Sequence, residues 1–442
     1  MCAFYGPLDG SLSAKRIRRK SRNYGGAINH SFCKIYKPFY FSFLQLFFLQ
    51  LYSWDEKNMR RPHAFLLFVS GLVIGSLMQV FRRYDQTYRP TLRSGSFDRV
   101  ANASVAHRST GFRSTATIRG KNYTPSIMEQ YVLDHADELG YNDAQREKMG
   151  HGCPIWTDQS KSEIYQNLVT YRQELAEYNR LLRNFNHSIK DLRHHLGDEN
   201  DICSTLELHP NGLEGIFSKN SLSYSPKSGF LEPLMPPMRD PALCIEGLGK
   251  ILSMEYFVHD FAAMCRKLLP TSRTVLVDMG ASLNFHGGHG QPAIYLLHIF
   301  QKFGFHFDHV YAYEITQNEP SRVFELVPAS LQAAYHWINV GVNPDPASPL
   351  NPLSMILDNY NEDDFIVVKL DIDTPSVEMP LANQLLNDPR FQNRVDSFYF
   401  EHHIFLKELE SSWGGGVSGS IKDSLDLFHN LRRKGISAHS WV

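Results

Sequence analysis

The stretch Phe-Ile-Val-Val-Lys-Leu-Asp-Ile-Asp at residues 365–373 decides the fold that we predict for this chain. It starts as a short apolar run of the kind that forms a fully buried strand, and it ends in two acidic residues. Similar short runs lie on both sides of it. Together they predict strands at Thr274–Asp278, His309–Tyr313, His336–Val340, Phe365–Asp371 and Asp396–Glu401.

Stretches with helical periodicity separate these runs. The last helical stretch starts at a capping box formed by Ser420 and Asp423 and stops at Gly435, after which residues 436–442 can form a closing strand. Because strands and helices alternate, residues 241–442 are predicted to form an α/β fold with a Rossmann-like, doubly wound, mostly parallel sheet. The expected helices are Gly249–Leu268, Pro292–Phe303, Ser321–Ala334, Ser376–Leu386 and Ile421–Lys434.

The first two predicted strands end in residues that suit a nucleoside, and sheets of this kind bind ligands at the carboxyl ends of their strands. Asp-Met-Gly-Ala-Ser follows the first strand at residues 278–282, and glycine permits a sharp turn close to a ligand. A glutamate ends the second strand, where a carboxylate can accept hydrogen bonds from a ribose diol. A plain tight turn and a surface glutamate are the alternatives. The candidate cofactor-binding residues are Asp278, Gly280, Ala281, Ser282 and Glu314.

Acidic residues and histidines follow the fourth and fifth predicted strands. Asp371 and Asp373 are two positions apart, so in an extended chain they share one face and can hold a divalent cation or act as acid and base. Glu401, His402 and His403 end the fifth strand, and a histidine can be the general base for a hydroxyl. We name Asp371 and His402 as candidate catalytic residues. The alternative is that Glu401 and the histidines only satisfy one another.

These segments, in this order and spacing, resemble the FkbM-type S-adenosylmethionine-dependent methyltransferases over residues 270–405. The similar segments are Val-Asp-Met-Gly-Ala-Ser, Val-Tyr-Ala-Tyr-Glu, Val-Val-Lys-Leu-Asp-Ile-Asp and Phe-Tyr-Phe-Glu-His-His. The resemblance implies S-adenosylmethionine as cofactor, with Asp278, Gly280 and Ala281 lining it, Glu314 on its ribose and Asp371 near the reacting centre. The chain departs from the family pattern at two places. Asp-Thr-Pro at residues 373–375 stands where the family has an acid followed by glycine, and the second glycine of the first loop is displaced to residue 287.

The activity that the resemblance implies is O-methyl transfer to a hydroxyl group, for which a lumenal glycan is the natural acceptor class. The main alternative is a type II Golgi glycosyltransferase that holds a metal and a nucleotide sugar with the Asp-x-Asp at residues 371–373, and a third is an inactive scaffold. Alanine at Asp278 or Glu314 is expected to weaken cofactor binding at least tenfold, or about 1.4 kcal/mol, with melting nearly unchanged.

The charge of the chain is unevenly distributed. Its 442 residues include 45 Lys and Arg against 46 Asp and Glu, yet residues 1–120 carry a net charge of +14 and the remainder −15. Because the part with a folded pattern is acidic, we expect no binding to nucleic acid.

Residues 63–81 contain no charged side chain and are long enough for a single transmembrane signal anchor, with a buried core helix as the alternative. The basic segment before them, residues 1–62, favours a cytoplasmic N-terminus and a lumenal catalytic domain. We therefore expect a type II membrane protein of the Golgi or endoplasmic reticulum, with residues 82–150 as a flexible stem. A start at Met59 would give a conventional signal anchor, so residues 1–58 can be an extension of the gene model. Four cysteines beyond the span are compatible with two disulfides.

A seam of apolar residues with alternating spacings of four and three lies within residues 151–240, which we expect to form a helical segment and a linker. Such a heptad pattern predicts a long helix that ends at Gly197. A homodimeric coiled coil and a helix lying on its own domain explain the pattern equally well. The seam consists of Ile164, Leu168, Tyr171, Leu175, Tyr178, Leu182, Phe185, Ile189, Leu192 and Leu196.

Overall fold

The structure is a computed structural model that describes residues 122–185, 189–197, 202–209, 211–283, 292–413 and 416–442. The predicted basic segment, the predicted membrane span and the start of the predicted stem lie outside the described residues. Among the residues that are described, every helix is too short or too polar to cross a bilayer. All of them belong to one compact unit.

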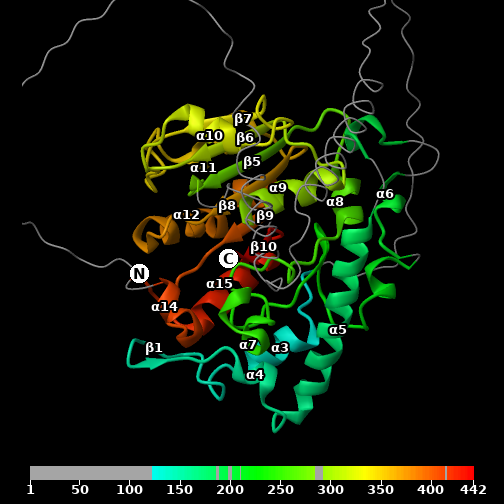
Figure 1. Ribbon diagram of the computed structural model, residues 1–442, viewed down its shortest axis with the longest axis vertical. Coiled ribbons are helices and arrows are strands. Elements are labelled where there is room, and N and C mark those ends of the chain that lie inside the picture. Colours follow the sequence, from blue (N-terminus) through cyan, green and yellow to red (C-terminus); the bar gives the residue numbers. More distant parts are fainter. Residues whose placement is uncertain (1–121, 186–188, 198–201, 210, 284–291, 414–415) are drawn as a thin grey trace, which may run out of the picture. The chain divides into compact units, whose positions relative to one another are not determined.

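A parallel sheet of six strands forms the centre of this unit (Figure 1). The strands lie in the order β10-β9-β8-β5-β6-β7, and every neighbouring pair is parallel. When the six strands are numbered 1 to 6 along the chain and read from β7 to β10, their order is 3-2-1-4-5-6, which is the order of Rossmann-like sheets. The predicted α/β fold with a parallel sheet is therefore confirmed. The strands are β5 (Thr274–Met279), β6 (His309–Tyr313), β7 (Tyr335–Ile338), β8 (Phe365–Leu370), β9 (Val395–Phe400) and β10 (Ser437–Ser440).

The register of the sheet brings the carboxyl ends of the strands level with one another. Met279 pairs with Tyr313 on one side and with Leu370 on the other, and Leu370 pairs with Phe400. Every residue of β5, β8 and β9 is buried, as expected for parallel strands covered on both faces. The strand order reverses between β5 and β8, which is where such sheets bind ligands.

Helices connect the strands and cover the sheet; Figure 1 shows α9 and α12 on opposite sides of it. The predicted capping box of the last helix is confirmed, because Ser420 and Asp423 exchange both capping hydrogen bonds. The connecting helices are α9 (Pro292–Lys302), α10 (Pro320–Leu326), α11 (Pro352–Asn359), α12 (Pro375–Asn387), α13 (Pro389–Arg394) and α15 (Ile421–Arg433).

Two predicted helices are shorter than expected. The one expected at residues 321–334 ends at Leu326, where Val327 is extended because the following proline disfavours the helical conformation. The one expected at residues 249–268 begins only at Phe261 as α8 (Phe261–Lys267), after Asp260, whose side chain caps it.

The residues before the sheet belong to the same compact unit as the sheet. Part of the expected stem, after Ser126, carries a helix and a short hairpin. The elements of this region are α3 (Ile127–Asp134), β1 (Ala144–Gln145), β2 (Lys148–Met149), α4 (Pro154–Thr157), α5 (Ser162–Asn184), η2 (Leu192–His194), α6 (Ile202–Thr205), η3 (Gly212–Gly215), β3 (Ser223–Ser225), β4 (Gly229–Leu231), α7 (Leu243–Glu246) and η4 (Leu248–Lys250).

The heptad seam is buried within the single chain. Six of its residues lie on α5 and are at most 6% exposed. Tyr178 donates a hydrogen bond to the His259 carbonyl at 3.2 Å, and Phe185 packs on Phe303 with ring centroids 4.5 Å apart. The helix ends at Asn184 rather than at residue 196, because Phe185 is extended and turns onto that ring. The seam therefore serves as the contact of a helix with its own domain.

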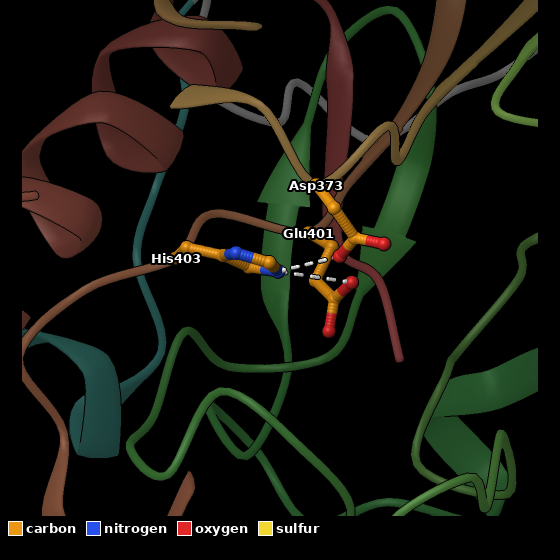
Figure 2. A group of neighbouring side chains, drawn as sticks. All are labelled: Asp373, Glu401 and His403. Atoms are coloured by element: carbon orange, nitrogen blue, oxygen red, sulfur yellow. Dashed lines mark ion pairs between the residues drawn. The ribbon is translucent and has the colours of Figure 1, made fainter. Parts of the chain in front are cut away.

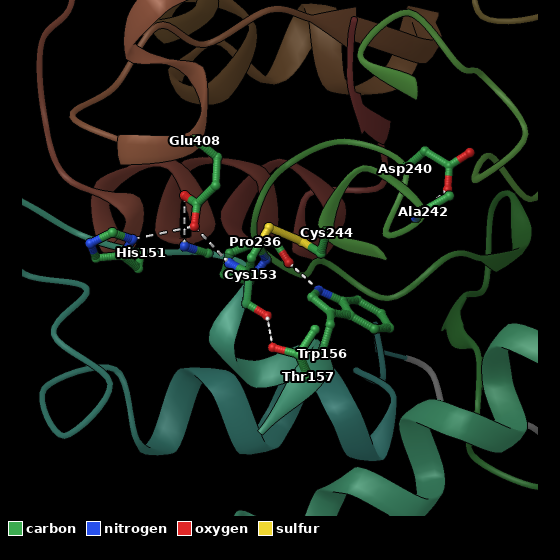
Figure 3. The surroundings of a disulfide bond; sticks show 10 residues. His151, Cys153, Trp156, Thr157, Pro236, Asp240, Ala242, Cys244 and Glu408 are labelled. Atoms are coloured by element: carbon green, nitrogen blue, oxygen red, sulfur yellow. Dashed lines mark hydrogen bonds and ion pairs between the residues drawn. A yellow bond between two sulfur atoms is a disulfide. The ribbon is translucent and has the colours of Figure 1, made fainter. Parts of the chain in front are cut away.

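Two disulfides tie this region together. Cys153 is bonded to Cys244, which joins the start of α4 to α7, and Cys203 is bonded to Cys265, which joins α6 to α8. Around the first, Glu408 accepts hydrogen bonds from the backbone N–H groups of residues 152 and 153 at 3.0 and 3.1 Å (Figure 3). Glu408 lies in η6 (Lys407–Leu409), just before α14 (Glu410–Trp413), so the disulfide region contacts the segment that follows β9.

Candidate functional site

Gly280 forms the turn between β5 and the rest of the candidate site. Its φ is +89°, and a Cβ placed on it would lie 1.6 Å from the Asp371 carbonyl oxygen, so no other residue fits. The N–H groups of Gly280 and Ala281 both donate to the Tyr313 carbonyl at 3.0 Å. The turn therefore links the carboxyl ends of β5, β6 and β8.

Asp278, expected to line the cofactor, pairs inside the sheet with Lys369. The Lys369 ammonium donates to Asp278 Oδ1 at 2.9 Å and to the Gly280 carbonyl at 3.1 Å. Both side chains are buried, and they occupy paired positions of β5 and β8. Burial lowers the pKa of Lys369, but Asp278 and Asp371 outweigh it and hold that pKa above its usual value. Asp278 thus helps to position the glycine turn.

Glu314 follows β6 and is 8% exposed. Its Oε1 accepts a hydrogen bond from the Thr316 N–H at 2.6 Å, which fixes the carboxylate at the edge of the sheet. Ala281 is buried and Ser282 is partly exposed beside it. The loop that follows, with the displaced glycine at position 287, lies outside the described residues. The structure therefore brings Gly280, Ala281 and Glu314 to adjacent strand ends.

Asp371 and Glu401 form a buried carboxyl pair after β8 and β9. Burial and the neighbouring Glu401 raise the pKa of Asp371 well above its usual value, although Lys369 opposes this. Burial works in the same direction on Glu401, but Arg239, His403 and Asp371 hold its pKa below the usual range. The two carboxyl groups therefore differ, because Asp371 is the more easily protonated member of the pair and Glu401 the more easily ionised one.

A second group of site residues follows β8 and β9. It consists of Asp373, Glu401 and His403 (Figure 2). His403 Nε2 lies 3.2 Å from Glu401 Oε2 and 3.6 Å from Asp373 Oδ1. One ligand atom from each of the three residues lies within 4.8 Å of the others, so the group can hold a metal ion. Glu378 lies close by, and its Oε1 accepts a hydrogen bond from the Ile372 N–H at 2.9 Å.

The two acids of the Asp-x-Asp segment have different surroundings. Asp371 Oδ2 accepts a hydrogen bond from Trp441 Nε1 at 3.1 Å and lies 3.4 Å from the Lys369 ammonium. The Asp373 side chain is 82% exposed and faces His403. The expected shared face requires an extended chain, but β8 ends at Leu370 and Asp373 has a φ of +55°.

His402, the expected base, lies next to this group in sequence but has different surroundings. It is 6% exposed and stacks on Phe400 with ring centroids 5.3 Å apart. Burial lowers its pKa to about 4, so the imidazole is neutral at physiological pH. Asp423 and His403 are the charged groups that act on it.

Several site residues escaped the sequence analysis. Arg239 forms an ion pair with Glu401, and Trp413 Nε1 donates to Glu401 Oε1 at 2.8 Å. Trp441, which directly follows β10, reaches Asp371. Lys369 could have been predicted, since it is the one charged residue in an otherwise apolar strand, and a lone buried charge of this kind indicates a specific partner. No local sequence pattern indicates that Arg239, Trp413 and Trp441 contact Glu401 and Asp371.

Comparison with known proteins gave no relatives. No protein-family model matches the chain, and no curated protein or solved structure matches it either.

Proposed function

We propose that this protein is an S-adenosylmethionine-dependent O-methyltransferase whose methyl donor binds at the carboxyl ends of β5 and β6. The observation that carries the proposal is the Gly280 turn, which lies at the point where the strand order reverses and beside the carboxylate that ends the next strand. Sheets with this strand order bind nucleosides at this point. The resemblance of the same segments to the FkbM-type enzymes supports the adenosyl donor.

In this proposal each residue at the two strand ends has a separate role. Glu314 accepts hydrogen bonds from the ribose diol, since its carboxylate is already oriented by the Thr316 N–H. Gly280 and Ala281 let the cofactor approach the backbone closely. Asp278 and Lys369 act as positioning residues, because Lys369 also donates to the Gly280 carbonyl.

The proposed reaction places the acceptor beside the residues that follow β8 and β9. The acceptor oxygen attacks the methyl carbon, the carbon–sulfur bond breaks, and the hydroxyl proton passes to an ionised group of the site. Most of the rate enhancement comes from holding donor and acceptor in line.

We also propose that residues 63–81 anchor the protein as a single-pass type II membrane protein and that the described unit lies in the secretory lumen. The two disulfides support this, since such bonds persist in oxidising compartments. A glycan hydroxyl is then the acceptor class nearest at hand. Metal-dependent glycosyl transfer is the second candidate. It needs both acids on one ion, whereas Asp371 is buried against Trp441 and Asp373 is exposed beside His403.

Calorimetry on the purified full-length protein tests the proposal. S-adenosylhomocysteine is expected to bind, and Glu314→Gln is expected to weaken binding at least tenfold, about 1.4 kcal/mol. Glu319→Gln is the matched control, because this exposed residue lies on the same connection after β6. Binding of a nucleoside diphosphate with manganese in the absence of S-adenosylhomocysteine binding would overturn the methyltransferase proposal.

A further inference from the structure

His403 is a buried imidazole without a hydrogen-bonded partner. It is 3% exposed, and neither ring nitrogen has a hydrogen bond in the described part of the chain. Its Nε2 points toward the carboxylates of Glu401 and Asp373, as Figure 2 shows, without forming a hydrogen bond to either. A buried ring nitrogen that faces two carboxylates in this way is suited to share a cation with them.

A second buried atom beside this group also lacks a partner. Glu378 is 1% exposed, and its Oε2 has no hydrogen bond among the described residues, whereas Oε1 is held by the Ile372 N–H. Glu378 interacts electrostatically with His403, Glu401 and Asp373. Two carboxylates therefore face one imidazole, with a third carboxyl group close enough to act on them electrostatically, an arrangement that a divalent cation satisfies.

The ligand atoms are held in place by surrounding residues. Glu401 Oε1 accepts from Trp413 Nε1, and Arg239 also binds that oxygen, which leaves Oε2 to face His403. Contacts of this kind fix the orientation of metal-ligating carboxylates. The Asp373 side chain is 82% exposed, so it can adjust its position and leaves the site open to solvent.

We infer that Asp373 Oδ1, Glu401 Oε2 and His403 Nε2 bind one divalent transition-metal ion, with Glu378 next to it. Bonds of about 2.0–2.2 Å place two ligands of one ion at most about 4.4 Å apart. The three atoms lie within 4.8 Å of one another, so a small rotation of the exposed Asp373 completes the site. One imidazole with carboxylates suits Mn²⁺, Fe²⁺ or Zn²⁺ better than Ca²⁺.

Three protein ligands leave coordination positions for water or for an oxygen of the substrate. An ion here would orient the acceptor hydroxyl and lower its pKa. This role rests on the proposed methyltransferase function, whereas the binding of the ion does not.

The test is calorimetry on chelator-treated, full-length protein with MnCl2 and, separately, ZnCl2. One ion per chain is expected to bind, and Asp373→Asn and His403→Asn are each expected to weaken that binding at least tenfold. Asparagine tolerates the positive φ of residue 373, so the first variant keeps the backbone. Asp358→Asn, at an exposed aspartate outside the group, should bind the ion as the unmodified protein does.

Lack of binding by either ion overturns the inference, and so does binding that neither site variant weakens. Titration with S-adenosylhomocysteine in the same samples separates the two proposals. Cofactor binding without metal binding removes only the metal site. Metal binding without cofactor binding removes the methyltransferase and leaves the metal site in place.

Discussion

Lys369 is enclosed by the ends of the strands, with Asp278, Asp371 and the Gly280 carbonyl as its partners. Removing one partner of a buried ion pair leaves an uncompensated charge. We therefore expect replacement of Asp278 to destabilise the fold, and not to leave melting nearly unchanged as the sequence alone indicated. Asp278→Asn should lower the free energy of unfolding by about 3 kcal/mol, the lower end for such pairs because Lys369 keeps Asp371. Urea denaturation of the purified protein measures it.

The control for this variant is Asp388→Asn, which removes the partly exposed charge beside Arg390 but keeps a side chain that can cap α13, and it should change stability by less than about 1 kcal/mol. Equal stability of Asp278→Asn and the unmodified protein would show that the Lys369 pair contributes nothing.

Glu232 gives a pH dependence that belongs to a single residue. Although burial opposes it, His439 and Arg432 lower the pKa of Glu232 to about 2. A depressed carboxyl pKa stabilises the fold above the unfolded value near 4.5, and this stabilisation is lost as the pH falls from about 4.5 to 2. The loss amounts to about 3 kcal/mol at about 1.4 kcal/mol per pKa unit.

Unfolding free energies of Glu232→Gln across that pH range should therefore fall less steeply than those of the unmodified protein. At pH 7 the same variant should be less stable, because Arg432 loses its buried partner. Glu325→Gln, at an exposed position, should follow the unmodified curve. Parallel curves for Glu232→Gln and the unmodified protein would contradict the assignment.

Local sequence patterns revealed the site residues that end their own strands. Gly280 and Glu314 were predictable because a glycine after a buried strand and an acid at the next strand end are local patterns. Arg239 and Trp441 were not, since they reach Glu401 and Asp371 from distant parts of the chain. The different surroundings of Asp371 and Asp373 also depend on a positive φ that a pattern of alternating acids does not indicate.

At the scale of the elements, Gly280 in the turn after β5 can be compared with Gly140, which lies between α3 and β1 and also has a positive φ. Gly280→Ala meets the Asp371 carbonyl at 1.6 Å, whereas Gly140→Ala has nothing within 4 Å. Both variants carry the backbone strain of about 1–2 kcal/mol, and only the first must also move β8, for about 1–3 kcal/mol more. Urea denaturation should rank them in this order. Equal losses would mean that the approach of β5 to β8 is looser than described.

The helix α5 shows why a heptad pattern does not by itself specify a partner. Leu168→Ala should lower the unfolding free energy by about 2–5 kcal/mol, because the side chain is 1% exposed within its own chain. Gln166→Ala, on the exposed face of α5, should change little. Light scattering should give the same mass for both variants. A change of mass with Leu168→Ala, at unchanged stability, would favour the homodimeric coiled coil.

The strands of the sheet were predictable because burial on both faces leaves a largely apolar run in the sequence itself, as in β5 and β8. The ends of the helices were less predictable. Phe185, the residue after α5, packs on Phe303, which lies far along the chain. The order of the strands in the sheet could not be predicted from such local patterns, because the pairing of β5 with β8 joins segments about ninety residues apart.

At the scale of the whole molecule, the two disulfides join α4 to α7 and α6 to α8, all of which precede the sheet. They close loops of 91 and 62 residues. Constraining loops of this length in the unfolded chain contributes about 2–5 kcal/mol each, so the fold depends on a compartment in which the bonds persist. The location and the stability of the protein are therefore linked through four cysteines.

Mass mapping of the native protein, alkylated before any reduction, tests this link. Peptides joined through Cys153–Cys244 and Cys203–Cys265 are expected, and reduction should lower the melting temperature because the unfolded chain gains entropy. The replacement Cys203→Ser with Cys265→Ser should reproduce part of that loss without any reductant. Alkylated thiols at all four positions in the native protein would place the described unit in a reducing compartment. The proposal of a lumenal enzyme with a glycan acceptor would then fail, while the cofactor and metal sites at the ends of the strands would stand on their own tests.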